Sequence, residues 1–302
     1  MINPTDPPVV VGVDGSARSR EAVAVAVREA RLHRRPLRLV HAFEWPLLGV
    51  YLGPSPEGPP EGGLAAEADR ILAEGLAHAA EVDRDLRADD ADELPVIGEV
   101  ITGQAATVLL REAQQAALVV LGDRGLGGFS GLLIGSVAVQ LSAHAPGPVL
   151  VVRGEQHAGP LVLGVDGSQR GSEAVAFAFA EAAARGVELL AISAWSARPS
   201  VRAQDELPLV YDASDIESAQ VRLLREALAG ARERWPQVRV REQVIRGRPA
   251  RVLIDASADA QLVVVGARGR GGFTGLLLGS VSQALLYHSH CPVAVVRQSQ
   301  PD

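Results

Sequence analysis

Lysine is absent from this sequence of 302 residues, so all 29 strongly basic side chains are arginines. Without lysine, the chain offers neither the phosphate-binding lysine of a P-loop nor a lysine for Schiff-base or general-base chemistry. Its single cysteine, Cys291, excludes an intrachain disulfide and a metal site built from several cysteines. Arginine is therefore the only side chain with a permanent positive charge for a phosphate.

An excess of positive charge is also missing, because the formal net charge is −7. A surface that follows nucleic-acid phosphates is usually basic, so nucleic acid is not expected as a partner. No apolar run reaches the length of a membrane span, and residues 1–8 lack the basic and apolar regions of a signal peptide. We therefore expect a cytoplasmic protein that does not bind membranes.

One stretch of the sequence occurs twice, at residues 122–136 and 266–280, and eleven of its fifteen positions agree. Each copy contains the pattern Gly-x2-Gly-x9-Gly-Ser, follows an apolar β-branched run and precedes an apolar helical pattern. The length of the chain and its 47% hydrophobic content suit two domains. We therefore interpret the chain as two copies of one domain, each with a glycine loop between a strand and a helix.

Such a loop can bind an anion. The first turn of a helix leaves N–H groups unpaired and carries partial positive charge, and glycines let a ligand approach the backbone closely. Ser136 and Ser280 stand where a hydroxyl caps the helix or bonds a phosphate oxygen. A plain glycine-rich turn is the alternative, but two copies with the same spacing favour a phosphate site.

Apolar runs and helical patterns alternate in the same order in both halves. The expected strands are 8–13, 37–42, 95–101, 118–121 and 148–152, then 161–165, 188–194, 238–245, 262–265 and 292–296. The longer expected helices are 18–33, 65–87, 172–185 and 214–234, and shorter ones end near 114 and 257 or follow the glycine loops. Residues 49–63 and 197–212 read as irregular crossovers, and residues 153–159 as a linker.

This alternation predicts two doubly wound α/β domains with parallel sheets and helices on both faces. Ligands of such sheets lie beyond the carboxyl ends of the strands, where the strand order reverses. If strands one and four flank that reversal, Asp14 and Gly122 converge on one crevice, and Asp166 and Gly266 on another.

At these residues the sequence resembles the universal stress protein family. The resemblance rests on the strand that ends Gly-Val-Asp-Gly-Ser, the glycine loop and the closing Pro-Val-x-Val-Val-Arg, which occur in both halves. It implies tandem, Rossmann-like, five-stranded domains at 1–153 and 160–302, with strand order 3-2-1-4-5 and a pseudo-twofold relation. It also implies one bound ATP in each domain.

The resemblance also implies which residues contact ATP. Asp14 and Asp166 would face the ribose, Ala42 and Ala194 would offer backbone groups to the adenine, and the loops would hold the phosphates, which Mg2+ or Mn2+ can bridge without protein ligands. The implied nucleotide-binding residues are Gly12, Asp14, Ala42, Gly122, Asp123, Arg124, Gly125, Gly127, Gly128, Gly135, Ser136 and Val137 in the first half, and Gly164, Asp166, Ala194, Gly266, Ala267, Arg268, Gly269, Gly271, Gly272, Gly279, Ser280 and Val281 in the second.

Some of these residues have a second interpretation. Asp14 and Asp166 each precede glycine and suit an Asx turn, although their recurrence at the expected crevice favours the ligand. Arg124 and Arg268 suit either a phosphate or a surface carboxylate. The loops differ at Asp123 against Ala267 and at Leu126 against Arg270, and we expect the second site to bind ATP more tightly because it carries the more positive loop.

Other conspicuous side chains suit structural roles. His144, His288 and His290 lie near helix C-termini, where a positive charge is favourable. His41 ends a strand beside the expected adenine edge without a nucleophile to activate, and Phe43 and Trp195 suit core packing after the second strands. Cys291 suits a small buried apolar position.

These features predict an ATP-binding sensor or regulator of the stress response rather than an enzyme. The alternative is a slow ATPase or phosphotransfer enzyme, and a third possibility is a scaffold in which nucleotide is only structural. Binding is favoured because the sequence has no Walker A motif, kinase signature or G-x-G-x-x-G loop. The apolar fifth strands are expected to pair within the chain as a pseudo-dimer; a protein partner and a further homodimer are compatible with the sequence.

Overall fold

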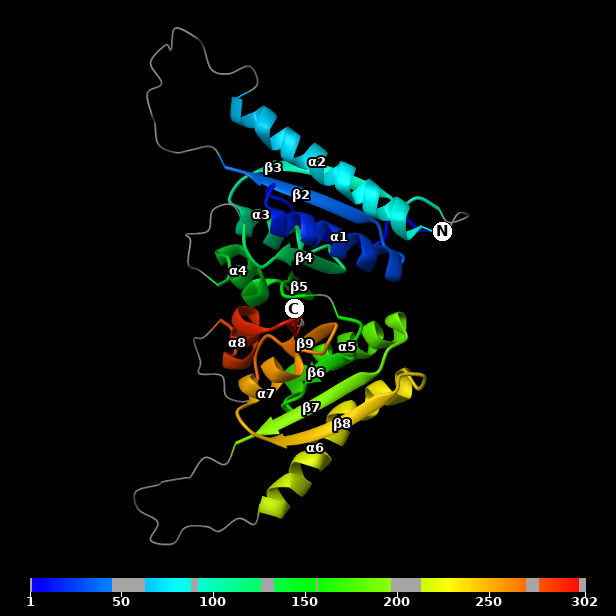
Figure 1. Ribbon diagram of the computed structural model, residues 1–302, viewed down its shortest axis with the longest axis vertical. Coiled ribbons are helices and arrows are strands. Elements are labelled where there is room, and N and C mark those ends of the chain that lie inside the picture. The colour runs from blue at the N-terminus through cyan, green and yellow to red at the C-terminus, as the bar shows by residue number, and fades with distance from the viewer. Residues whose placement is uncertain are drawn as a thin grey trace, which may run out of the picture. The chain divides into compact units, whose positions relative to one another are not determined.

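The computed structural model describes residues 2–44, 63–87, 92–125, 133–155, 157–196, 213–269 and 277–298. The chain divides into two compact units, Met1–Arg153 and Gly154–Asp302, named unit 1 and unit 2 below. Figure 1 shows strands and helices alternating along the chain in both units. Each unit is described by itself.

Unit 1 is a parallel sheet of order β3-β2-β1-β4-β5. Four helices connect its five strands. In chain order the elements are β1 Val9–Gly12, α1 Ala17–Leu32, β2 Leu37–Phe43, α2 Gly63–Leu86, β3 Val96–Thr102, α3 Ala105–Glu112, β4 Leu118–Gly122, α4 Ser136–His144 and β5 Val149–Val152.

Unit 2 repeats this arrangement, with the order β10-β9-β6-β7-β8 and every described pair parallel. A short 3₁₀ turn, η1, precedes its first helix. The elements are β6 Leu161–Gly164, η1 Gln169–Gly171, α5 Ser172–Arg185, β7 Leu189–Trp195, α6 Ala213–Arg234, β8 Val240–Arg246, α7 Pro249–Ala256, β9 Leu262–Gly266, α8 Ser280–His288 and β10 Val293–Val296.

The tandem α/β architecture with parallel sheets is therefore confirmed, and the differences lie in detail. The first strand is shorter than predicted, and β8 begins at Val240 rather than at residue 238. The first helix, predicted to begin at residue 18, begins one residue earlier, at Ala17. The central strands are buried on both faces, as their continuous apolar sequences predict: β1, β4 and β5 have no exposed residue. The predicted crossovers fall almost wholly outside the described residues.

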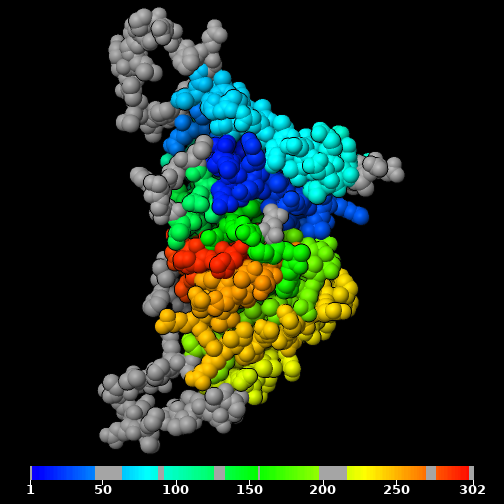
Figure 2. Space-filling model, in the orientation of Figure 1, coloured from blue at the N-terminus to red at the C-terminus, as the bar shows by residue number. Residues whose placement is uncertain are grey.

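The helices form two layers in each unit. In unit 1, α1 packs on α2 and α3 on α4, and in unit 2, α5 packs on α6 and α7 on α8. Gly98 of β3 allows α2 to lie close, since a Cβ there would stand 2.9 Å from the Leu76 side chain. The long helices α2 and α6, cyan and yellow in Figure 2, lie at the surface of their own units.

The start of unit 2 is held against its own body. Gly154 has a φ of 63°, and a Cβ there would overlap the backbone of His290. Gly159 lies as close to the backbone of Asp259, and Glu155 N donates to His290 O at 2.9 Å. These glycines are required because no side chain fits where the two backbones approach.

Candidate nucleotide crevices

A crevice opens in unit 1 because β1 and β4 turn away from each other at their carboxyl ends. Their ladder ends at the pair Val11 and Val120. Beyond it, Val13 N donates to Val40 O of β2 at 2.9 Å, whereas Asp123 N donates to Val152 O of β5 at 3.0 Å. The chain therefore leaves the sheet on two diverging paths, which is the reversal point where parallel sheets bind ligands.

Unit 2 has the same divergence. The ladder between β6 and β9 ends at Leu163 and Val264. Val165 N then donates to Ile192 O at 2.9 Å, and Ala267 N donates to Val296 O at 2.8 Å. The expected convergence of the first and fourth strands of each half on one crevice is thus observed in both units.

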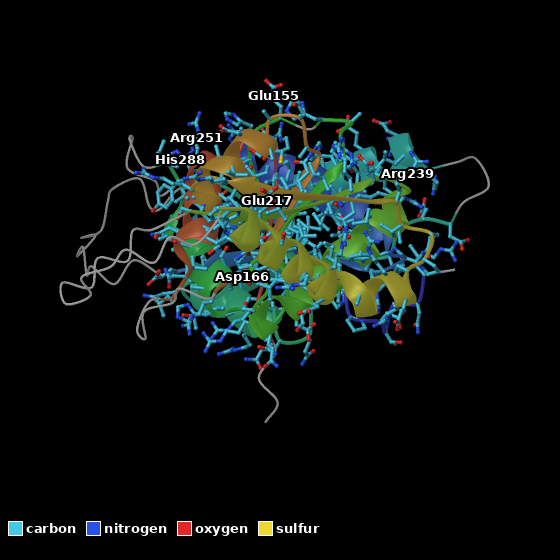
Figure 3. The ribbon with its side chains drawn as sticks, turned by 90° about the horizontal axis from the view of Figure 1, so that it is seen from below. Glu155, Asp166, Glu217, Arg239, Arg251 and His288 are labelled. Atoms are coloured by element: carbon cyan, nitrogen blue, oxygen red, sulfur yellow. The ribbon has the colours of Figure 1, made fainter. Side chains whose placement is uncertain are left out.

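An aspartate and a loop glycine meet across each crevice. A Cβ built on Gly125 would overlap Asp14 Oδ2, and one built on Gly269 would overlap Asp166 Oδ2. Asp166, labelled in Figure 3, is exposed, and Asp14 is half-buried. A Cβ at either position would have to displace the carboxylate, so the backbone of the glycine loop comes directly next to the acid.

The same aspartates also form Asx turns. Asp14 Oδ1 accepts from Ser16 N at 3.0 Å, and Asp166 Oδ1 accepts from Ser168 N at 2.9 Å. The glycines between them, Gly15 and Gly167, have φ values of 83° and 69°. The turn interpretation therefore applies to Oδ1 while Oδ2 lies next to the loop, and the turn orients the carboxylate.

The helix that follows each loop is not capped by its serine, which corrects one prediction. Ser136 and Ser280 are the first helical residues, and Gly135 and Gly279 are the N-caps, without a side-chain cap bond. A hydroxyl one position later cannot reach the N–H groups that an N-cap side chain serves. Both serines are exposed, and Val137 and Val281 are half-buried.

Two of the backbone donors assigned to phosphates are already used. Gly135 N donates to Asp123 O at 2.7 Å, and Gly279 N donates to Ala267 O at 2.8 Å. These bonds close each glycine loop onto the end of its strand. In α4 the bond from Val139 N to Gly135 O follows, so the N–H groups of residues 136–138 point out of the first turn. These three N–H groups have no partner within the helix, whereas that of Gly135 is already used.

Gly12, Gly164 and Gly122 serve close packing between elements, whereas the nearest atom to a Cβ on Gly266 would be Arg268 O of its own loop, at 3.2 Å. A Cβ on Gly12 would stand 2.9 Å from Leu121, and one on Gly164 would stand 2.7 Å from Leu253. The same construction on Gly122 meets the backbone of Arg18 at 2.9 Å. Gly12 and Gly164 let leucine side chains pack on the strand ends, Gly122 brings the end of β4 beside the first helix, and contact of these glycines with nucleotide stays a prediction.

Ala42 and Ala194 lie where the ladders become one-sided. The ladder of β1 with β2 ends at Val40, whereas the ladder of β2 with β3 continues through Ala42 to Phe43. Ala194 occupies the equivalent place in β7. His41 is buried beside Ala42, and its Nδ1 lies 2.8 Å from Val13 O. This contact holds the ring against the first strand, in agreement with a structural role.

An ion pair with a buried carboxylate distinguishes the crevice of unit 1 from that of unit 2. Asp123 is 4% exposed, and its Oδ1 lies 3.4 Å from Arg18 Nε and 3.9 Å from Arg124 Nε. Arg18 also donates to Glu21 at 2.7 Å. The bond to Glu21 raises the pKa of Arg18 above its ordinary value, burial opposes this, and the charge of Asp123 adds to it. Arg124 thus pairs with a carboxylate.

The second unit lacks this pair because Ala267 stands at the place of Asp123. Arg268 donates from Nε to Leu277 O at 3.4 Å. Sequence reasoning missed Arg18 and its equivalent Arg170, because a single arginine in the first turn of a helix has no distinctive pattern. Their fixed distance from the Asp-Gly-Ser turn was the available signal. Leu126, Gly127, Gly128, Arg270, Gly271 and Gly272 lie outside the described residues.

The remaining singled-out side chains have ordinary surroundings. His144 Nδ1 lies 2.9 Å from Gln140 O at the last residue of α4. His288 ends α8, and Cys291 is fully buried. Gly103 N donates to Phe43 O, and Gly247 N to Trp195 O, each at 2.8 Å, so those aromatics hold equivalent positions.

Within the described ranges, no helix has both the length and the apolarity needed to cross a membrane.

Comparison with known proteins gives one consistent result. The universal stress protein family model matches residues 7–153 and 158–297. A universal stress protein of Mycobacterium tuberculosis is 40% identical over 301 residues, covering 96% of this chain and 97% of the relative. One of Mycolicibacterium smegmatis is 38% identical over 297 residues, or 96% of each chain. The crystal structure of a universal stress protein from Archaeoglobus fulgidus shares the fold, with a TM-score of 0.66, 17% identity, and coverage of 96% and 98%.

Proposed function

Because this chain belongs to the universal stress protein family, we propose that it binds ATP in both crevices and acts as a nucleotide-dependent regulator of a stress response. One observation carries the proposal. In each unit an aspartate oxygen adjoins a loop glycine so closely that a Cβ on the glycine would overlap it, at the divergence of two parallel strands. Two copies of such a contact are difficult to explain by folding alone.

The donors and acceptors suit a nucleotide. The carboxylate beside the glycine loop can accept hydrogen bonds from the hydroxyls of a ribose. The N–H groups in the first turn of α4 or α8 can donate hydrogen bonds to phosphate oxygens. Ala42 and Ala194 lie beyond the end of the ladder with the first strand of their unit, and their backbone groups on that side would meet the base. A divalent ion would arrive with the phosphates, which it bridges.

Regulation is proposed rather than catalysis because the acidic groups of unit 1 already have contacts. One oxygen of Asp14 belongs to a turn, and Asp123 is buried beside Arg18. Phosphoryl transfer requires a carboxylate that holds a metal ion and a group that orients the nucleophile. Binding that stabilises one conformation for a partner requires neither.

Calorimetry with ATP tests the proposal. The unaltered chain is expected to bind two equivalents, and Gly125→Ala or Gly269→Ala to leave one each, because the added Cβ displaces the adjoining aspartate. Gly230→Ala is the control, since its Cβ would meet no atom within 4 Å. The proposal would be contradicted if Gly125→Ala and Gly269→Ala each still bound two equivalents of ATP with unchanged affinity, or if the unaltered chain bound no ATP. Mass spectrometry of nucleotide in the purified protein gives an independent check.

A further inference from the structure

The two crevices have the same arginine but different partners for it. Arg18 and Arg170 each stand four residues after the crevice aspartate, and Glu21 and Glu173 follow three residues later. The position across from the arginine is Asp123 in unit 1 and Ala267 in unit 2. The first loop glycine lies beside the backbone of this arginine in both units: the Cβ position of Gly122 lies 2.9 Å from Arg18 O, and that of Gly266 lies 3.9 Å from Arg170 O, which is an ordinary van der Waals contact.

In unit 1 the arginine is committed to acidic side chains. Arg18 donates to Glu21, and its Nε stands 3.4 Å from Asp123 Oδ1. Oδ1 of Asp123 has no hydrogen bond from the described residues, so charge alone holds the pair. A carboxylate that is 4% exposed cannot be hydrated in place. An arginine that moved from it to a phosphate would leave the buried carboxylate with only the longer contact to Arg124 Nε, at 3.9 Å, which is costly.

In unit 2 the equivalent arginine lacks that constraint. Arg170 is exposed and lies in the 3₁₀ turn η1, at the N-terminal end of the first helix region. Among the residues that the structure describes, no carboxylate lies within ion-pairing distance of Arg170, and Glu173 is exposed without an ion pair to it. The charge of Arg170 is therefore not committed to a carboxylate of the described residues, and the backbone of Arg170 lies beside the start of the glycine loop.

We propose that Arg170 binds the phosphates of the ligand in unit 2, whereas Asp123 withholds Arg18 from the phosphates in unit 1. The inference rests on the proposed nucleotide function and names the residue that makes the two sites unequal. It differs from simple repulsion between Asp123 and phosphate, because the effect of Asp123 passes through Arg18. Unit 2 then prefers ligands with several phosphates, and unit 1 depends more on the nucleoside.

The first experiment isolates unit 2 in the full chain with Gly125→Ala. Arg170→Gln is expected to weaken ATP binding roughly tenfold or more, the effect of losing a charged hydrogen bond. Arg170→Lys should recover part of the loss because it restores the charge. Adenosine should bind both variants equally, since it has no phosphate. An equal loss for adenosine and ATP would indicate a structural role and overturn the inference.

The second experiment isolates unit 1 with Gly269→Ala and uses a double-mutant cycle. Arg18→Gln alone should change the Kd for ATP by less than about twofold, whereas Asp123→Ala should tighten binding roughly tenfold. Arg18→Gln added to Asp123→Ala should abolish that gain. Alanine is a fair choice because Ala267 occupies the position in unit 2, and Asp123→Asn provides a second variant of similar volume.

The outcomes separate the two proposals. A gain from Asp123→Ala that survives Arg18→Gln means direct repulsion or release of Arg124, and overturns the inference, as does the absence of any gain in a chain that binds ATP. Both of these results leave the proposed function intact. If the unaltered chain binds no ATP, the proposed function fails and the inference fails with it.

Discussion

The contribution of a single acidic residue to the stability of this protein depends on whether its ion pair is buried or exposed to water. Asp83 of α2 is buried, and its Oδ1 lies 2.5 Å from Arg31 Nε of α1 while its Oδ2 accepts from Leu94 N at 3.3 Å. Glu74 on the same helix pairs with Arg70 in solvent. Both are acid–arginine contacts, yet only the first ties two helices and a loop together.

Replacement of the buried acid should therefore be the more damaging change. We expect Asp83→Asn to lower the free energy of unfolding by about 3 kcal/mol, because Arg31 keeps a partly buried charge without its partner. The matched exposed variant, Glu74→Gln, should cost less than about 1 kcal/mol. Urea unfolding measures both, and equal losses would show that burial does not control the strength of these pairs.

At the scale of elements, two glycines allow the effect of backbone conformation on stability to be measured without a change in packing. Gly186 follows the last residue of α5 with a φ of 64°, and Gly230 lies inside α6. A Cβ on either one would meet no atom within 4 Å. Any change in stability on substitution by alanine must then come from backbone conformation.

These two substitutions should have opposite signs. Gly186→Ala is expected to destabilise the protein by about 1 kcal/mol, because L-residues are strained in the left-handed conformation. Gly230→Ala is expected to stabilise it by roughly 0.5 to 1 kcal/mol, because alanine is a better helix former. Thermal unfolding of the two single variants provides the comparison, and a shift in the same direction would refute this account.

Elements also decide which loop groups can meet a ligand. Helices α4 and α8 both begin at a serine, and the N-cap of each is a glycine without a side-chain cap bond. The N–H of that glycine donates to the carbonyl oxygen of the residue after the strand, and this bond closes both loops. Because two sequences that differ around this point form the same closure, the loop geometry comes from the strand–helix junction. The charge carried by the loop is free to differ.

At the scale of the whole molecule, each of the two units is compact by itself and has its own crevice. Trp195 and Trp235, two of the three tryptophans, belong to unit 2, and the ring of Trp235 lies 6.1 Å from that of the fully buried Phe179. Tryptophan emission should therefore follow the unfolding of unit 2 in particular.

Ligand should stabilise each unit through its own crevice. ATP at one hundred times its Kd should add about 2.7 kcal/mol to the unit that binds it. Melting followed by tryptophan emission should shift upward with ATP in Gly125→Ala and stay unchanged in Gly269→Ala. An ATP-dependent shift that survives Gly269→Ala would mean that the ligand of unit 2 lies elsewhere.

The assignment of the whole protein as a regulator also predicts slow turnover. Phosphate release from ATP should stay below about one per second, since the described crevices contain no pair of free carboxylates arranged for catalysis. A coupled phosphate assay on the purified chain measures this. Faster release that disappears in the variant carrying both Gly125→Ala and Gly269→Ala would favour an ATPase.

The sequence by itself determined the tandem repeat and the parallel α/β sheets. That an aspartate and a glycine loop meet in each half followed only on the condition that the first and fourth strands flank the reversal, and the tertiary structure supplied that condition. Continuous apolar strands, helical periodicity and glycine spacing are local properties, so they can be read without coordinates. The predicted helix from Ser172 to Arg185 is observed with the same bounds for this reason. The pairing of the fifth strands within the chain stays a prediction.

Only the tertiary structure decided how individual groups are used. It placed Ser136 inside the helix rather than at its cap, gave the N–H of Gly135 to Asp123 O, and buried Asp123 beside Arg18. Each of these depends on a contact between residues far apart in the chain, or on which neighbour takes a hydrogen bond first. A repeated sequence therefore specifies two copies of one fold, whereas the surroundings of one buried carboxylate make the two crevices electrostatically different.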